Sequence, residues 1–223
     1  MNDIFHDSKS FLVAYKPQNI SINKYELELK QRFNLSYLKS VYSLDNLAGG
    51  VVVLAKTEAA YKMLLTQYNN GEFDFNFYAV VVGDGKQNNG VINTFCARDS
   101  KAKRLSRVPQ LTQNALHIVF DYEFLDRVQQ IALVKLRTNM FFDESVRFSC
   151  FDLGSPIFGD AVYGGDSLAK NTNLGLVLGV VRFKSLDSNE NLNFVALPNE
   201  NKPWTYFDVK KWFGVIKGGN YGR

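Results

Sequence analysis

Apolar and β-branched residues gather in short runs bounded by polar, Gly or Pro residues, and such runs predict β-strands. The runs at 11–15, 51–57 and 75–84 are nearly continuous, which is typical of buried strands. Two pairs of runs are each separated by a short polar break and predict antiparallel hairpins. These hairpins join 115–125 to 129–138 and 174–185 to 192–197.

Apolar residues recur at helical spacing in two stretches, which predicts helices at 24–33 and 58–68. Thr57 is a suitable N-cap for the second of them. The segment 203–214 predicts a C-terminal helix with Pro203 in its first turn. Strand hairpins with helices between them favour an α+β fold with a mixed, mainly antiparallel sheet. No shift in composition divides the chain, so 1–223 is expected to be a single domain.

Composition and charge narrow the class of protein only a little. A chain of 223 residues with 46% hydrophobic and 22% charged residues is ordinary for a globular protein. The net charge of +4 is compatible with a polyanionic partner without establishing one. Cys96 and Cys150 are expected to be buried thiols, and two histidines are too few for a His-rich metal site. Because no apolar run has the length of a signal peptide core or a membrane span, we expect a cytoplasmic protein.

The segment 98–108 concentrates cations without apolar periodicity, so we expect a loop or an exposed hairpin tip. Two interpretations remain equally open: a solvated surface loop, or an arm that contacts phosphates. The cations are Arg98, Lys101, Lys103, Arg104 and Arg107, with Asp99 as the one anion among them.

Two further motifs are weak on their own. Ser43-Leu44-Asp45 precedes Gly49-Gly50 and a predicted strand, and an aspartate in such a loop is usually a turn former. The Gly-rich segment 153–165 matches neither the P-loop nor the dinucleotide fingerprint, and we expect packed turns under a cleft. No GxSxG elbow or Cys/His signature supports nucleophilic hydrolysis.

In order along the chain, however, these segments resemble the RluA-type pseudouridine synthases over about residues 11–198. FLVAYKPQNI resembles the family's first strand with its Lys-Pro, SLDNLAGGVVVLAKT its Arg-Leu-Asp segment, and NFYAVVVGD its Lys-x-Tyr strand. LGSPIFGDAVYGG follows Leu-Gly-His-Pro-Ile and Gly-Asp-x-x-Tyr-Gly, and LGVVRFKS and LNFVALP resemble the closing strands. The chain departs from the family at Ser43, Asn76 and Ser155, which replace an arginine, a lysine and a histidine.

The largest departure lies between Thr138 and Arg147, where the family has Thr-Gly-Arg-x-His-Gln-Ile-Arg. Only these two residues of the motif remain, with about two extra residues between them. If a bulge or turn absorbs the extra residues, Arg147 can still point into the cleft and pair with Asp45. If it does not, Arg147 turns outward.

The resemblance implies a pseudouridine-synthase fold, with its sheet split by a central RNA-binding cleft. It implies isomerisation of uridine to pseudouridine in structured rRNA or tRNA, with no metal and no organic cofactor. It also implies that the catalytic domain finds its RNA without a separate N-terminal RNA-binding domain. A monomer is favoured.

The resemblance places Asp45, Tyr78 and Arg147 in the active site. Asp45 would attack the sugar or assist removal of the C2′ proton, and Arg147 would keep it ionised and oriented. Tyr78 would lie against the uracil. The residues expected to contact RNA are Lys16, Ser43, Arg98, Lys101, Lys103, Arg104 and Arg107.

Two alternatives remain open beside the enzyme. One is a catalytically inactive RNA-binding relative of the same fold, and the other is a protein-interaction domain on that fold. Retention of Asp45, Tyr78 and Arg147 favours the enzyme. The lost arginine, lysine and histidine favour the inactive relative.

Overall fold

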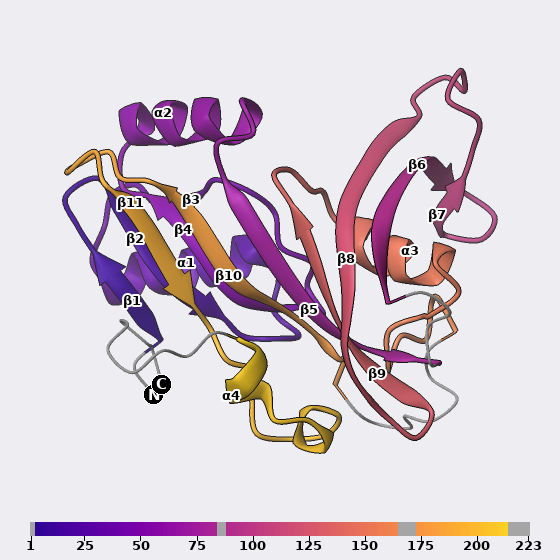
Figure 1. Cartoon of the computed structure of the whole chain (residues 1–223). Coiled ribbons are helices and arrows are strands. Elements are labelled where there is room, and N and C mark those ends of the chain that lie inside the picture. Colours follow the sequence, from indigo (N-terminus) through magenta and orange to yellow (C-terminus); the bar gives the residue numbers. More distant parts are fainter. Residues whose placement is uncertain (1–2, 84–87, 165–172, 214–223) are drawn as a thin grey trace.

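A single mixed sheet organises the computed structural model, which describes residues 3–83, 88–164 and 173–213 (Figure 1). Among these residues the strand order is β1-β2-β4-β10-β5-β9-β8-β6-β7, with β3 paired to β4 and β11 to β10. Only β4 and β10 run parallel, so the predicted mixed, mainly antiparallel sheet is confirmed. The strands are β1 Ile4–Asp7, β2 Phe11–Lys16, β3 Lys39–Ser40, β4 Gly49–Ala55, β5 Asp74–Val82, β6 Asn89–Asp99, β7 Arg104–Arg107, β8 Leu116–Val128, β9 Ile131–Thr138, β10 Leu176–Lys184 and β11 Asn191–Val195.

Helices α1 (Ile22–Arg32) and α2 (Glu58–Asn69) form where the apolar spacing predicts them. The predicted N-cap of α2 is confirmed, because the Thr57 hydroxyl accepts a hydrogen bond from the Ala60 N–H at 3.1 Å. Helix α3 (Ser145–Asp152) was not predicted, because six of its eight residues are buried and its pattern has no polar face. No helix in the described ranges is long and apolar enough to cross a membrane.

The predicted continuous helix at 203–214 is wrong. A 3-10 helix at Trp204–Tyr206 and the short α4 (Val209–Trp212) are separated by Phe207, whose backbone is extended. Asp208 then caps α4 by accepting a hydrogen bond from the Lys211 N–H. Asp84, Gly165 and Gly214, which end three of the predicted segments, lie outside the described residues.

Strand β5 divides its side chains between two separate apolar clusters, as the two-residue period of a strand requires. Phe75 and Phe77 belong to the larger cluster, and Tyr78 and Val80 belong to the smaller one, which also contains Phe213. Residues 77 and 78 therefore serve opposite faces of the sheet.

Gly50 is where β4 comes closest to β10. Its φ is +137°, and a Cβ atom there would lie 2.4 Å from the carbonyl oxygen of Leu178 and 2.6 Å from its nitrogen. Only a glycine allows the two backbones to approach this closely at Gly50. Because Gly50 directly follows the loop that carries Asp45, this approach fixes that loop against β10.

We expect Gly50→Ala to lower the free energy of unfolding by more than ~3 kcal/mol, because both the φ value and the Leu178 backbone oppose a side chain. Gly154→Ala is the matched control: Gly154 also has a positive φ, +79°, but a Cβ there meets nothing within 4 Å. That control should cost only about 1–2 kcal/mol. Urea denaturation of both variants measures the difference, and equal losses would contradict the close approach.

Candidate active site

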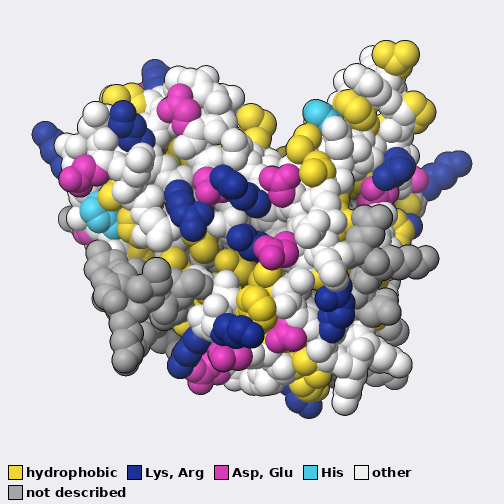
Figure 2. Space-filling view, in the orientation of Figure 1, with side chains coloured by type: hydrophobic (Ala, Val, Ile, Leu, Met, Phe, Trp, Pro, Cys, Tyr) yellow, Lys and Arg dark blue, Asp and Glu magenta, His cyan; other side chains and the backbone are white. Residues whose placement is uncertain are grey.

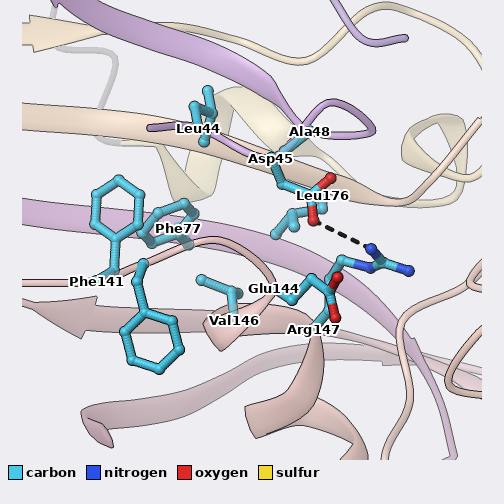
Figure 3. Close-up of a pocket in the computed structure, with 10 residues that line it drawn as sticks. Leu44, Asp45, Ala48, Phe77, Phe141, Glu144, Val146, Arg147 and Leu176 are labelled. Carbon is cyan, nitrogen blue, oxygen red and sulfur yellow. Dashed lines mark hydrogen bonds and ion pairs between the residues drawn. The ribbon is translucent and has the colours of Figure 1, made fainter. Parts of the chain in front are cut away.

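A narrow pocket with an empty volume of about 220 Å³ lies between the loop at 43–48, the middle of β5 and the start of α3 (Figure 3). Figure 3 shows Phe77 and Phe141 at one end, and Asp45, Glu144 and Arg147 at the other. The remaining lining residues are apolar: Leu44, Ala48, Phe142, Val146 and Leu176. The pocket therefore presents three charged side chains against an otherwise hydrophobic wall.

Asp45 is held in one orientation by its own loop and by Arg147. Its Oδ1 accepts a hydrogen bond from the Leu47 N–H at 2.9 Å, and its Oδ2 accepts one from Arg147 Nη1 at 3.1 Å. The side chain is 14% exposed. One carboxylate oxygen thus stabilises the turn, while the other faces the pocket beside a guanidinium.

Arg147 is buried and bridges two carboxylates. Its Nε and Nη2 donate to the two oxygens of Asp160 at 2.7 and 2.8 Å, in the bidentate arrangement that suits a guanidinium. Burial lowers the pKa of Arg147, but hydrogen bonds and charge from Asp160 and then Asp45 raise it above its usual value. Arg147 is therefore a permanent cation beside Asp45.

The extra residues before Arg147 form a turn, as predicted for an inward-pointing arginine. Strand β9 ends at Thr138, and the chain then crosses to α3 through 139–144, where Glu144 adopts a left-handed backbone with φ 65°. The Phe141 N–H donates to the Tyr68 hydroxyl at 3.3 Å, which anchors the start of this crossing. The predicted pairing of Arg147 with Asp45 is present in the structure.

The predicted placement of Tyr78 in the pocket is wrong. Tyr78 faces the other side of the sheet, where its ring stacks on Phe213 with centroids 3.8 Å apart, and burial raises its pKa to about 12. The pocket ring is Phe77. The predicted Lys-x-Tyr match is therefore displaced by one residue, and a shift of one residue moves a strand side chain to the opposite face.

Lys16 does not contact solvent, so the structure contradicts its predicted role in binding RNA. It is fully buried, and its ammonium donates hydrogen bonds to the carbonyls of Pro17 and Ile20, both at 2.9 Å. Burial lowers the pKa of Lys16 to about 8, although Asp45 and Asp143 act to raise it. Lys16 is thus a buried cation that ties together the backbone behind the Asp45 loop.

Ser43 is exposed and its hydroxyl donates to Asp143 at 3.0 Å. Burial raises the pKa of the Asp143 carboxyl, the Ser43 hydrogen bond lowers it, and the charges of Asp45 and Glu144 raise it further. The position at which the family has an arginine therefore holds a hydroxyl that is bonded to an acid of the 139–144 crossing.

The basic segment is the tip of the β6–β7 hairpin, which we call the arm (residues 96–107). Lys101 and Lys103 are exposed in its turn, where Asp99 accepts hydrogen bonds from the backbone of Lys101 and Ala102. The prediction of an exposed hairpin tip is confirmed, and the arm borders the pocket because Arg98 reaches Glu144.

The three arm arginines are engaged with the protein itself. Arg98 pairs with Glu144 at 2.7 Å, and Arg107 pairs through two hydrogen bonds with Asp152 at the end of α3. The Arg104 guanidinium lies 4.6 Å from the centre of the Phe151 ring. These contacts dock the arm on α3 and leave the two lysines as its outward-facing cations.

Four residues that sequence reasoning did not assign are central to the site. Asp160 is fully buried and receives the Arg147 guanidinium, and Glu144 lines the pocket. The Tyr163 hydroxyl donates to Glu144 at 3.2 Å and accepts from the Leu105 N–H at 2.9 Å. Asp160 and Tyr163 stand in the Gly-Asp-x-x-Tyr-Gly match, which could have indicated them, whereas Phe77 and Glu144 carried no signal.

Comparison with known proteins agrees with the predicted resemblance. The chain is 24% identical over 214 residues to YlyB, an uncharacterized RNA pseudouridine synthase of Bacillus subtilis, covering 89% of this chain and 70% of that protein. It is 27% identical over 141 residues to an uncharacterized RNA pseudouridine synthase of Aquifex aeolicus, covering 62% of this chain but 44% of that protein. No protein-family model matches the chain.

Solved structures show the same fold. Human RNA pseudouridylate synthase domain containing 1 superimposes with a TM-score of 0.76 at 20% identity, covering 89% of this chain and 83% of that one. Human RNA pseudouridylate synthase domain containing 4 gives a TM-score of 0.72 at 19% identity, covering 88% of each chain. The chain therefore has the pseudouridine-synthase fold and resembles pseudouridine synthases in sequence, while its assignment to the RluA type stays a prediction.

The buried Lys16 predicts an unusual dependence of stability on pH. In the unfolded chain a lysine has a pKa of about 10.4, whereas the folded value is about 8. Between these values the unfolded state binds more protons, so this group makes the free energy of unfolding rise with pH. Urea denaturation at pH 7 and pH 10 should show wild type gaining up to about 3 kcal/mol relative to Lys16→Met.

Lys24→Met, at an exposed position on α1, controls for the loss of one lysine. If the free energy of unfolding of wild type relative to Lys16→Met stays constant or falls as the pH rises, burial does not lower the pKa of Lys16.

Proposed function

We propose that this chain is an RNA pseudouridine synthase that isomerises uridine in structured rRNA or tRNA of the cytoplasm. The observation that carries the proposal is the Asp45 carboxylate, oriented by the buried Arg147 in a pocket with an aromatic wall. The sequence similarity to proteins named as RNA pseudouridine synthases supports the same function.

The reaction detaches uracil from C1′ of its ribose, turns it, and rejoins it to C1′ through C5. Asp45 starts the reaction in its ionised form, either by attacking the sugar or by assisting removal of the C2′ proton. Arg147 orients Asp45, because its Nη1 donates a hydrogen bond to Oδ2 and places a guanidinium beside the carboxylate. Asp160 acts through Arg147, since it holds the guanidinium in place.

The target uridine must leave its stack to reach this pocket, at a cost of a few kcal/mol. Phe77 offers an aromatic ring against which the extruded base can lie, and such stacking is worth ~1–3 kcal/mol per base. Lys101 and Lys103 supply the phosphate contacts from the arm. The face of the molecule in Figure 2 interleaves cations and anions rather than gathering cations.

An inactive RNA-binding relative is the second candidate, and one observation favours it. The pocket aromatic, Phe77, carries no hydroxyl, so the pocket lacks the phenol that a tyrosine at that position would supply. Activity measurements separate the two candidates.

We expect Asp45→Asn to abolish tritium release from RNA labelled at uridine C5, because the label leaves C5 only when C5 bonds to C1′. Phe77→Leu should reduce release about tenfold, through loss of stacking on the base. Tyr78→Phe should leave release unchanged, because Tyr78 lies on the opposite face of the sheet. Bulk RNA from cells lacking the protein is the substrate.

Wild-type release no higher than that of Asp45→Asn, in protein that binds RNA, would favour the inactive relative. Release that falls with Tyr78→Phe but not with Phe77→Leu would contradict the assignment of Phe77 to the base. Thermal unfolding of each variant separates a loss of chemistry from a loss of fold.

We expect the Lys101→Ala/Lys103→Ala double variant to bind RNA more weakly and with a log–log salt slope that is shallower by nearly 2 units, because two phosphate contacts are lost. The matched control is Lys9→Ala/Lys24→Ala, which removes two exposed lysines at the opposite side of the molecule, near β1 and α1 (Figure 1). Fluorescence anisotropy at several salt concentrations measures both slopes. Equal salt slopes in the two double variants would show that the arm lysines do not contact phosphates and that the arm is an ordinary solvated surface.

A further inference from the structure

The pocket is closed on one side by three residues of the crossing between β9 and α3, Phe142, Asp143 and Glu144, which we call the gate. Phe142 and Glu144 line the pocket directly. The pocket has only about 10 Å³ of space for water-sized molecules, enough for roughly one water, whereas pockets that enclose small ligands usually have ~300–1,000 Å³. An extruded nucleotide needs such an enclosing pocket. Admission of a uridine therefore requires the gate to move.

Both neighbours of the gate are fixed, so movement is confined to these three residues. Phe141 is buried and is hydrogen-bonded through its N–H to the Tyr68 hydroxyl. Ser145 begins α3 and is also buried. The gate is closed internally by two hydrogen bonds, Phe142 N–H to Ser145 Oγ at 3.2 Å and Ser145 N–H to the Phe142 carbonyl at 3.0 Å.

Each acid of the gate is held by a different wall of the pocket. Asp143 accepts a hydrogen bond from Ser43, two residues before Asp45. Glu144 accepts hydrogen bonds from Arg98 at 2.7 Å and from Tyr163 at 3.2 Å. Glu144 also has a positive φ of 65°, a strained conformation that a non-glycine residue keeps only where its surroundings enforce it. These side-chain contacts hold the closed position together with backbone hydrogen bonds, which include the one from the Phe148 N–H to the Glu144 carbonyl at 2.8 Å.

One of these contacts is accessible to RNA. Arg98 is on the arm and its side chain is 56% exposed, so a phosphate can approach the same guanidinium that holds Glu144. Exposed ion pairs of this kind are weak, whereas a guanidinium binds a phosphate well. Phosphate binding at Arg98 would leave Glu144 without its strongest partner.

We propose that RNA opens the pocket itself: a backbone phosphate takes Arg98 from Glu144, and the gate at 142–144 then moves away from Asp45. This inference rests on the proposed function and adds to it a closed state of the free protein. The pocket opens only after the arm has bound, so Asp45 meets a nucleotide that is already held by its backbone.

Hydrogen–deuterium exchange with an oligoadenylate RNA tests the proposal, because this RNA supplies phosphates but no uridine. On saturation with oligoadenylate, the peptide covering 142–145 should exchange faster, while the arm exchanges more slowly. In Arg98→Ala the peptide should already exchange fast in the free protein, with no further change on RNA binding.

Arg107 and Asp152 give the matched control, because they form the same kind of pair between the arm and α3 but neither lines the pocket. Arg107→Ala should leave exchange at 142–145 slow in the free protein and still responsive to RNA. Glu144→Gln and Asp152→Asn should each raise the affinity for oligoadenylate about two- to fivefold, by releasing an arginine. Only Glu144→Gln should speed exchange at 142–145, and its effect on affinity should vanish in Arg98→Ala.

Unchanged or slower exchange at 142–145 with oligoadenylate bound would overturn the proposal, and so would a failure of oligoadenylate to bind. A purely structural role for Glu144 would instead appear as a lower melting temperature with no gain in affinity. Tritium release from uridine-labelled RNA is measured separately. If wild type releases tritium but hydrogen exchange at 142–145 does not change, the gate is contradicted and the proposed function stands. If hydrogen exchange changes but no tritium is released, the proposed function is contradicted and the gate stands.

Discussion

The geometry of the pocket depends on one buried cation, Arg147, because its guanidinium joins the Asp45 loop to α3 and to the turn that holds Asp160. Two of its nitrogens bind Asp160, which also accepts hydrogen bonds from the backbone of Val162 and Tyr163, both at 3.1 Å. Asp45 receives only one hydrogen bond from Arg147. Buried charges are costly unless they are fully paired, so Asp160 anchors the guanidinium. Asp45 is therefore the less firmly held of the two carboxylates that contact Arg147.

Much of the fold could be predicted from the sequence, because in most helices and strands the residues that are apolar in the sequence pattern are the ones that are buried in the structure. The runs of β2, β4 and β5 are apolar on both faces, and the spacing in α1 and α2 marks a single buried side. Helix α3 has no such contrast. Its polar residues Ser145, Arg147 and Ser149 are buried, where the serine hydroxyls bond to backbone and Arg147 to carboxylates. The local hydrophobic pattern therefore fails to predict a helix whose polar side chains are buried and bonded to residues elsewhere in the fold.

In the candidate site, the sequence predicted only those residues that the order of the motifs along the chain was enough to identify. Asp45 follows a strand-loop pattern and Arg147 was placed by counting back from Gly154, and both positions survive in the structure. Tyr78 failed because a strand inverts its faces at every residue, so an error of one position exchanges it with Phe77. Lys16 failed for another reason: the sequence shows a cation but not its burial. The arm arginines stay a prediction, because the sequence does not show that Arg98 and Arg107 pair with Glu144 and Asp152.

The departures from the family pattern near Asp45 have a common effect: they make the surroundings of the pocket less positive. Ser43 replaces a cation near Asp45, while Glu144 adds an anion to the pocket lining and Asp143 adds a second one next to it, bonded to Ser43. The pocket entrance thus has less positive charge than the family pattern implies, and phosphates gain little by entering it. Because Lys101 and Lys103 lie on the arm, the attraction for the RNA backbone is displaced away from Asp45. Under the proposed function, such a distribution of charge favours an RNA backbone that stays on the arm, outside the pocket.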